Sequence, residues 1–125
     1  YLNYSKKNNG QRFRLLELAE LLRFIRYEST GVLLPHRDLS FKYNNHKQTL
    51  QSVVIYLTKG TTKFLKDAPG GDWSRSSCPE EVDFAVEANP GDILIFDHEL
   101  LHESENNNLE KIIIRSDLVY EKIIF

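Results

Sequence analysis

The sequence predicts a mainly β fold, of the sandwich or barrel kind, with one helix near the N-terminus. Short segments rich in β-branched and apolar residues recur along the chain, and turns that contain Gly or Pro separate them. Many short strands at close spacing are typical of sandwiches and barrels. The 125 residues suffice for one domain with one sizeable core, so we expect a single domain over residues 1–125.

The helix is expected over residues 11–23. Four apolar residues recur there at helical spacing: Leu15, Leu18, Ala19 and Leu22. This spacing would put them on one face of a helix, which predicts an amphipathic helix packed outside the β-structure.

Seven strands are expected after the helix, with turns and one long loop between them. The predicted strands are residues 24–27, 32–34, 50–57, 61–65, 81–86, 92–96 and 111–120. The predicted turns are residues 28–31, 59–60 and 89–91, which contain Gly or Pro. Loops as long as residues 66–79 are often lids or binding loops. We expect substrate specificity to depend on this loop and on residues 42–49.

Charge and composition narrow the class of protein. The net charge of −2 gives no signal for nucleic-acid binding, and no apolar run reaches the roughly 20 residues that a membrane span needs. One cysteine, Cys78, fits a reducing compartment, and the first residues lack the apolar stretch of a secretory signal. We therefore expect an intracellular protein, cytoplasmic or nuclear. Because the chain begins with Tyr1 and contains no methionine, we expect a processed chain, a domain fragment or an incomplete sequence rather than a complete translation product.

Three residues form a candidate metal site. His36 and Asp38 are two positions apart, so on a strand or at its end their side chains point to the same side and can reach one ion. His102 offers a third ligand from a distant part of the chain. Two imidazoles and one carboxylate on one face of an octahedron leave three open positions, which is the ligand set of non-haem Fe(II) oxygenases.

His102 also belongs to a competing motif. The segment His-Glu-Leu-Leu-His, from His98 to His102, matches the zinc-protease signature, which requires a helix with both imidazoles on one face. A predicted strand ends two residues before His98 and a polar stretch begins at Ser104, so the sequence offers no helix of useful length. Two ordinary histidines on a surface turn are a further alternative.

Residues 36–39, His-Arg-Asp-Leu, resemble the catalytic loop of protein kinases. However, Tyr43 stands where that loop has asparagine. The glycine-rich loop and the Asp-Phe-Gly motif of kinases do not occur in the sequence either. A protein kinase is therefore excluded.

An ordered set of motifs over residues 24–120 is similar to the Fe(II)/2-oxoglutarate-dependent oxygenase superfamily, in its prolyl-4-hydroxylase-like branch. The motifs are the strand at 24–27 with Gly31 after it, His-x-Asp at 36–38, Val-Ile-Tyr-Leu at 54–57, Thr-x-Phe at 62–64 and the distal-histidine block at 90–103. The resemblance implies a double-stranded β-helix, a jelly-roll or cupin-like fold of eight strands, with a supporting N-terminal helix. His36, Asp38 and His102 would be the catalytic iron ligands, inside the mouth of the barrel.

The resemblance also implies Fe(II) as cofactor, with 2-oxoglutarate and O2 as cosubstrates. Tyr56 would donate a hydrogen bond to 2-oxoglutarate and Tyr27 would lie near its other end, although tyrosines on strands are commonly core residues. Lys111 and Arg115 are the two candidates for the basic residue that pairs with the distal carboxylate. Lys111 matches the family pattern by its distance from His102. Arg115 has the better geometry for a carboxylate and belongs to an Arg-Ser-Asp motif, so the sequence slightly favours Arg115.

By this resemblance the protein is an oxidoreductase, a dioxygenase that hydroxylates a C–H bond and releases succinate and CO2. The sequence does not identify the substrate, and we expect a peptide or a small molecule. A metal-binding β-helix without turnover and, less favoured, a zinc hydrolase are the alternatives.

Overall fold

A computed structural model describes residues 5–28, 33–68, 70–105 and 109–124. These residues form nine strands and one 3-10 helix, η1 (Pro79–Glu81), which confirms the prediction of a mainly β fold. The strands are β1 (Ser5–Asn8), β2 (Gln11–Leu18), β3 (Arg23–Tyr27), β4 (Lys47–Tyr56), β5 (Gly60–Leu65), β6 (Val82–Ala88), β7 (Ile93–Asp97), β8 (His102–Ser104) and β9 (Lys111–Lys122). Within the described residues, no helix has the length and apolar character needed to cross a membrane.

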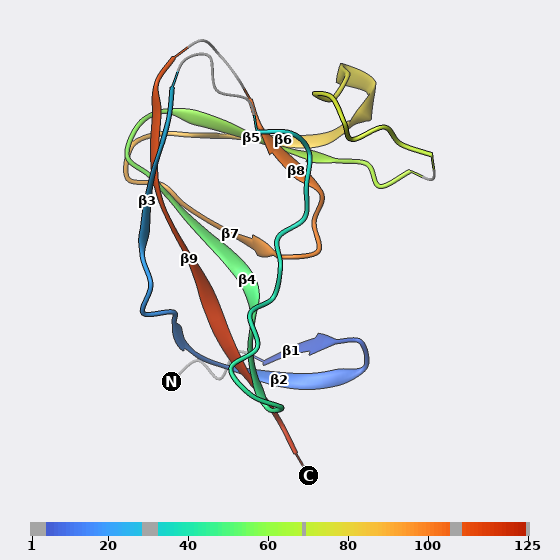
Figure 1. Cartoon of the computed structure of the whole chain (residues 1–125), viewed down its shortest axis with the longest axis vertical. Coiled ribbons are helices and arrows are strands. Elements are labelled where there is room, and N and C mark those ends of the chain that lie inside the picture. The colour runs from blue at the N-terminus through green and yellow to red at the C-terminus, as the bar shows by residue number, and fades with distance from the viewer. Residues whose placement is uncertain (1–4, 29–32, 69, 106–108, 125) are drawn as a thin grey trace.

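The strands form two curled antiparallel sheets (Figure 1). The larger sheet has the order β1-β2-β9-β4-β7, with β3 also paired with β9, and the smaller sheet has the order β6-β5-β8. The long strand β9 organises the larger sheet. Its first half pairs with β3 and its second half with β2, so β3 and β2 follow one another along one edge of β9, while β4 covers the other edge.

The helix predicted over residues 11–23 is wrong. Residues 11–18 form β2 instead, which pairs with β1 on one side and with β9 on the other. The helical spacing of leucines concealed a second pattern with period two, in which Phe13 and Leu15 pack in the core whereas Arg12 and Arg14 are exposed. Pairing on both edges and burial of Phe13 outweigh the weak local preference for a helix.

A hairpin turn directly before β2 is the sequence signal that the helix prediction missed. Asn9 and Gly10 connect β1 to β2, and both have positive φ, 50° and 80°. Asn-Gly favours the type I′ turn of two-residue hairpins, because both residues tolerate the left-handed backbone that this turn requires. The Asn-Gly pair therefore predicts two strands at this place in the chain.

The other predicted strands correspond to strands of the structure, with one exception. Leu33 and Leu34 are not part of a strand, and Val32 lies outside the described residues, as do Gly31 and the two residues before it. The predicted turn at 89–91 is present. There the Asp92 amide donates to the Asn89 carbonyl at 3.0 Å, and Gly91 has a φ of 92°.

The main core cluster lies between the two sheets. Its buried members are Val54, Tyr56, Phe64, Ala88, Phe96 and Ile113, which come from both sheets. A second cluster of Phe13, Leu50 and Tyr120 joins β2, β4 and β9. The Phe96 ring of the main cluster packs edge-on against His102, with 4.7 Å between ring centroids, so the candidate metal site borders the main core.

Candidate metal centre

His36 and Asp38 lie on the extended segment between β3 and β4, and backbone hydrogen bonds hold this segment against β8 and the turn before it. The amides of His36 and His102 each donate to the carbonyl of the other residue at 3.0 Å. The Asp38 amide donates to the His98 carbonyl, also at 3.0 Å. Residues that are far apart in the sequence are therefore placed side by side.

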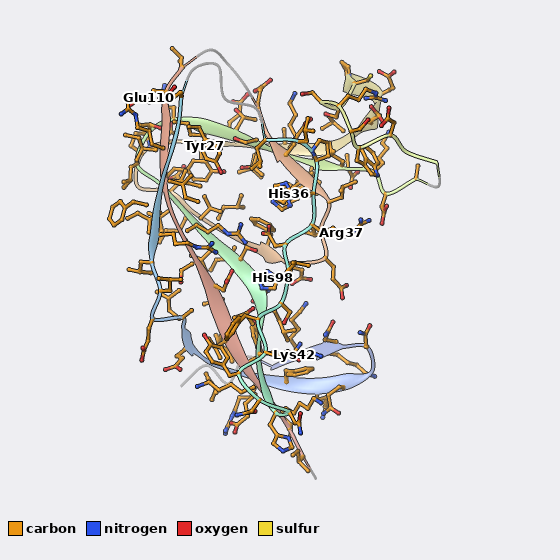
Figure 2. The ribbon with its side chains drawn as sticks, viewed as in Figure 1. Tyr27, His36, Arg37, Lys42, His98 and Glu110 are labelled. Carbon is orange, nitrogen blue, oxygen red and sulfur yellow. The ribbon has the colours of Figure 1, made fainter. Side chains whose placement is uncertain are left out.

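The three predicted metal ligands come together in this arrangement. Nε2 of His36 lies 3.4 Å from Oδ1 of Asp38, and Nε2 of His102 lies 3.8 Å from Oδ2. One potential ligand atom from each residue lies within 4.8 Å of the other two. Figure 2 shows His36 on the segment after β3 and Tyr27 on β3 itself. Both residues line the same pocket.

Two backbone carbonyls orient the imidazoles. Nδ1 of His36 lies 2.9 Å from the Leu34 carbonyl oxygen, and Nδ1 of His102 lies 2.8 Å from the Leu100 carbonyl oxygen. Because a carbonyl only accepts, Nδ1 carries the proton in each neutral ring, and the lone pair of Nε2 is left facing Asp38. Histidines that bind metals are held by the same kind of second contact. The donor set and its orientation fit a divalent cation.

The protonation of the cluster also suits a cation. Burial by itself raises the pKa of Asp38, but hydrogen bonds from His36 and Ser52 and the charge of Arg115 outweigh burial and hold that pKa well below its usual range. The hydrogen bond with Asp38 raises the pKa of His36, whereas burial lowers the pKa of His102. His102 is therefore a neutral ligand at pH 7, and a proton on Nε2 of His36 would compete with a cation for that atom.

Asp38 is held by two residues of the larger sheet. The Ser52 hydroxyl on β4 donates to Oδ2 at 2.5 Å, and Nη2 of Arg115 on β9 lies 3.0 Å from the same oxygen. The sequence analysis missed Ser52. A signal was available, because Ser52 stands four residues before Tyr56 on a predicted strand and hence on the same face.

A pocket beside the cluster contains both candidate anchors of a cosubstrate. It is lined by the three predicted ligands and, among others, by Tyr27, Thr62, Ser104, Lys111 and Arg115. Tyr56, the other tyrosine expected near the cosubstrate, is fully buried and its hydroxyl is hydrogen-bonded to that of Thr62. The predicted site residues therefore line one pocket, except for Tyr56, which contacts the lining residue Thr62 but does not line the pocket itself.

Lys111 is a buried cation without a carboxylate partner among the described residues. Only 7% of it is exposed, and its Nζ donates to the Ser104 hydroxyl. Nζ also lies 5.5 Å from the centre of the Tyr27 ring and 5.3 Å from that of Tyr56. Burial lowers the pKa of Lys111 to about 8, so the side chain is still mostly protonated at pH 7. A buried ammonium of this kind is costly unless an anion joins it.

The two remaining histidines lie outside the cluster. The segment from His98 to His102 forms a turn and the start of β8, without a helix, so it lacks the geometry of the zinc-protease signature. His98 is buried, and its ring nitrogens are hydrogen-bonded to Ser52 and Thr49. His46 is exposed on the turn before β4.

The loop between β5 and η1 is attached to both segments that carry predicted ligands. Arg37, between His36 and Asp38, forms an ion pair with Asp67 of the loop. Glu103, directly after His102, is buried and accepts hydrogen bonds from the Ser77 amide and hydroxyl. The described part of residues 66–78 contains no strand or helix, as the sequence predicts for a long loop.

A larger groove lies on the other side of Arg115. Its volume is about 760 Å³, and its lining is mixed, with apolar side chains such as Leu21 and Phe41 beside charged ones such as Arg23 and Lys47. Asp117 also lines the groove, and its Oδ1 lies 3.8 Å from Nη2 of Arg115. The pair of Arg115 and Asp117 therefore stands between the groove and the metal-ligand pocket.

Comparison of the chain with models of known protein families, with curated proteins and with solved structures gives no match.

Proposed function

We propose that the protein is an Fe(II)- and 2-oxoglutarate-dependent dioxygenase of the prolyl-4-hydroxylase-like branch. The observation that carries the proposal is the combination, in one pocket, of two oriented imidazoles, one ionised carboxylate and a buried cation without a carboxylate partner. The reaction is balanced as follows: O2 and 2-oxoglutarate give succinate and CO2, and one oxygen atom enters a C–H bond of the substrate.

The proposal includes the fold. We infer that the two curled sheets are the halves of a double-stranded β-helix with the metal site between them. In support, His102 comes from β8 of the smaller sheet, whereas Ser52, Lys111 and Arg115 come from β4 and β9 of the larger one. A site enclosed by the inner faces of two sheets is typical of jelly rolls.

His36, Asp38 and His102 would hold Fe(II), which supplies the position where O2 is activated when cosubstrate and substrate are bound. The role of the protein in this chemistry is to hold the metal-ligand atoms in the correct orientation and charge state. The carbonyls of Leu34 and Leu100 keep both Nε2 lone pairs toward Asp38, and the low pKa of Asp38 keeps its carboxylate charged.

Lys111 is the better candidate for the anchor of the distal carboxylate of 2-oxoglutarate. Arg115, which the sequence slightly favours, is already 3.0 Å from a carboxylate oxygen of Asp38. Lys111 has no such partner among the described side chains, and a dicarboxylate in the pocket would supply it. The hydroxyls of Thr62 and Ser104 line the same pocket and can donate to the ligand.

The pocket must widen to admit 2-oxoglutarate. Its free volume is about 40 Å³, which is room for an ion and water but less than a five-carbon dicarboxylate requires. Leu33 lines the pocket on the segment before His36 and is only half-buried, so its displacement is the simplest way to open the space. The groove beyond Arg115 is our candidate for the entry of a peptide or small-molecule substrate.

The test is anaerobic titration of 2-oxoglutarate into the Fe(II)-loaded protein, followed by the metal-to-ligand charge-transfer absorption. We expect the band in the parent protein and its loss in Asp38→Ala and His102→Ala. His46→Ala is the matched control, because His46 is exposed and is not part of the cluster, and it should keep the band. Exposure to O2 in the presence of a candidate substrate should then convert 2-oxoglutarate to succinate in the parent protein, with one oxygen atom entering succinate and the other the substrate.

The outcomes separate the alternatives. A protein that binds Fe(II) and 2-oxoglutarate but forms no succinate with any candidate substrate would be a binding module. Metal binding without any charge-transfer band would exclude 2-oxoglutarate as cosubstrate. A requirement for His98 as a ligand, with His102 dispensable, would contradict the assigned ligand set.

A further inference from the structure

Four buried polar side chains form one continuous set of hydrogen bonds that ends at the predicted metal ligand Asp38. Their exposed fractions are 1% for Thr49, 4% for His98, 0% for Ser52 and 9% for Asp38. Thr49 Oγ1 lies 3.0 Å from Nε2 of His98, and Nδ1 of His98 lies 2.8 Å from the Ser52 hydroxyl. The Ser52 hydroxyl in turn lies 2.5 Å from Oδ2 of Asp38.

The direction of each hydrogen bond follows from the chemistry of its two ends. The Asp38 carboxylate, paired with Arg115, only accepts, so the single Ser52 proton points to Asp38. The Ser52 oxygen must then accept from His98, which puts a proton on Nδ1. In the neutral ring Nε2 accepts from the Thr49 hydroxyl, and the Thr49 oxygen accepts from the Phe41 amide at 2.9 Å.

Neutral His98 agrees with its surroundings. Burial lowers its pKa, with Asp117 and Asp38 acting in the opposite direction. The bond from Nδ1 to Ser52 does not depend on this state, because a charged imidazole also donates from Nδ1.

We propose that Thr49, His98 and Ser52 form a directional hydrogen-bond chain that, together with Arg115, occupies Oδ2 of Asp38 and leaves Oδ1 as its single donor to the metal. The inference rests on the metal centre proposed above. The Ser52 hydroxyl donates to Oδ2, and Nη2 of Arg115 forms an ion pair with the same oxygen at 3.0 Å, so Oδ2 is the less available of the two oxygens for a metal. Oδ1 has Nε2 of His36 as its neighbour, at 3.4 Å, whereas Nε2 of His102 lies 3.8 Å from Oδ2.

Single-oxygen binding matters for the proposed reaction. An octahedral ion with two imidazoles and one carboxylate oxygen keeps three open positions, two for the cosubstrate and one for O2. If both oxygens of Asp38 bound the metal, only two positions would remain. Ser52 and His98 are therefore positioning residues, and their contribution does not require contact with the metal.

The first test uses the metal-free protein and is independent of the proposed function. Nitrogen-15 NMR of labelled histidine should show the His98 proton on Nδ1 in the parent protein. In Ser52→Ala this nitrogen loses its acceptor, so its chemical shift should change. A parent protein with the His98 proton only on Nε2 would overturn the chain.

The second test measures affinity for Mn(II). Loss of a residue that orients a ligand typically costs about 10–100-fold in metal affinity, and we expect a loss in this range for Ser52→Ala. Ser116→Ala is the matched control. Its hydroxyl is also buried but donates to the carbonyls of Ala19 and Leu21, so its removal should leave Mn(II) affinity unchanged.

A double-mutant cycle tests whether His98 acts through Ser52. His98→Ala should weaken Mn(II) binding in the parent protein but have no further effect in Ser52→Ala. His98→Asn keeps a donor near the position of Nδ1 and should restore most of the affinity. Independent effects of the two alanine substitutions, or full affinity in folded Ser52→Ala, would refute the proposal. If the parent protein itself binds no Mn(II), the metal centre fails, and the role of the chain at that centre fails with it.

Discussion

The ammonium of Lys111 lies over the face of the Tyr56 ring, 5.3 Å from its centre, and both side chains are almost completely buried. The ring offers the cation only weak compensation for lost water, on the order of 1–2 kcal/mol. In the free protein Lys111 is therefore a group that lowers stability, and we propose that it is retained for the binding of an anion.

Replacing Lys111 by methionine should have opposite effects on stability and on ligand binding. Lys111→Met keeps most of the side-chain volume and removes the buried charge, so the free energy of unfolding should rise by about 1–3 kcal/mol in urea denaturation. Affinity for 2-oxoglutarate should fall by about 100-fold or more, because the distal carboxylate loses its partner. Lys63→Met is the control, since Lys63 on β5 is only half-buried and forms an ion pair with Glu105. A loss of stability with unchanged affinity would show that Lys111 is a structural residue.

The pH dependence of Lys111 gives a second prediction. Its pKa is about 8 in the folded protein and 10.5 in the unfolded chain. Between these two values the unfolded chain binds more protons, so this group makes the free energy of unfolding increase as pH rises from about 8 to 10.5. Affinity for 2-oxoglutarate should decrease over the same range, because the neutral amine no longer pairs with a carboxylate. Both changes should be absent in Lys111→Met.

Metal binding should release a proton from His36. Its pKa is raised above the usual 6.5 by the hydrogen bond with Asp38, and a proton on Nε2 competes with the ion. Affinity for Mn(II) should therefore begin to fall, as pH is lowered, at a higher pH than for an ordinary histidine. Calorimetric titration in two buffers of different ionisation enthalpy measures the release directly. Equal heats in both buffers near the pKa of His36 would contradict the prediction.

In the metal-free protein, the raised pKa of His36 makes the fold more stable at low pH, whereas it weakens metal binding there. Protonated His36 pairs with Asp38, so its contribution to stability is present below the unfolded pKa of 6.5 and is lost as pH rises through the higher folded value.

Gly60 should be sensitive to substitution because of Lys111. A Cβ atom at this position would lie 2.9 Å from Cε of Lys111 and 3.1 Å from Cε1 of Tyr56. Gly60→Ala should therefore displace the lysine side chain, lower stability by about 1–3 kcal/mol and weaken 2-oxoglutarate binding by about tenfold. An unchanged titration would show that the lysine adjusts without loss of its contact.

Gly10 provides a contrasting substitution at the hairpin between β1 and β2. A Cβ atom there would meet no atom within 4 Å, but the φ of 80° is unfavourable for alanine. Gly10→Ala should lower the free energy of unfolding by about 1–2 kcal/mol through the backbone alone. Its affinity for Mn(II) and 2-oxoglutarate should equal that of the parent protein, which urea denaturation and the two titrations can establish.

The strands were easier to predict than the N-terminal region. Segments such as β4 and β9 carry consecutive apolar and β-branched residues, so their propensity and their burial favour the same structure. In β2 the two disagree. Leu15, Leu18 and Leu22 fit a helix, whereas the Asn-Gly turn and the alternation of Phe13 with arginines fit a strand, and pairing with β9 decides between them.

The sequence by itself determined the donor types and the spacing of His36 and Asp38, because an alternation of two positions puts both side chains on one side of an extended segment. Only the tertiary structure decided what surrounds them. Arg115 lies at Asp38 while Lys111 remains without a carboxylate among the described residues, and His98 hydrogen-bonds to Ser52. These relations join β4, β9 and the turn before β8, which are far apart in the chain. A contact between distant segments depends on sheet register and on the curl of the sheets, and local sequence patterns specify neither.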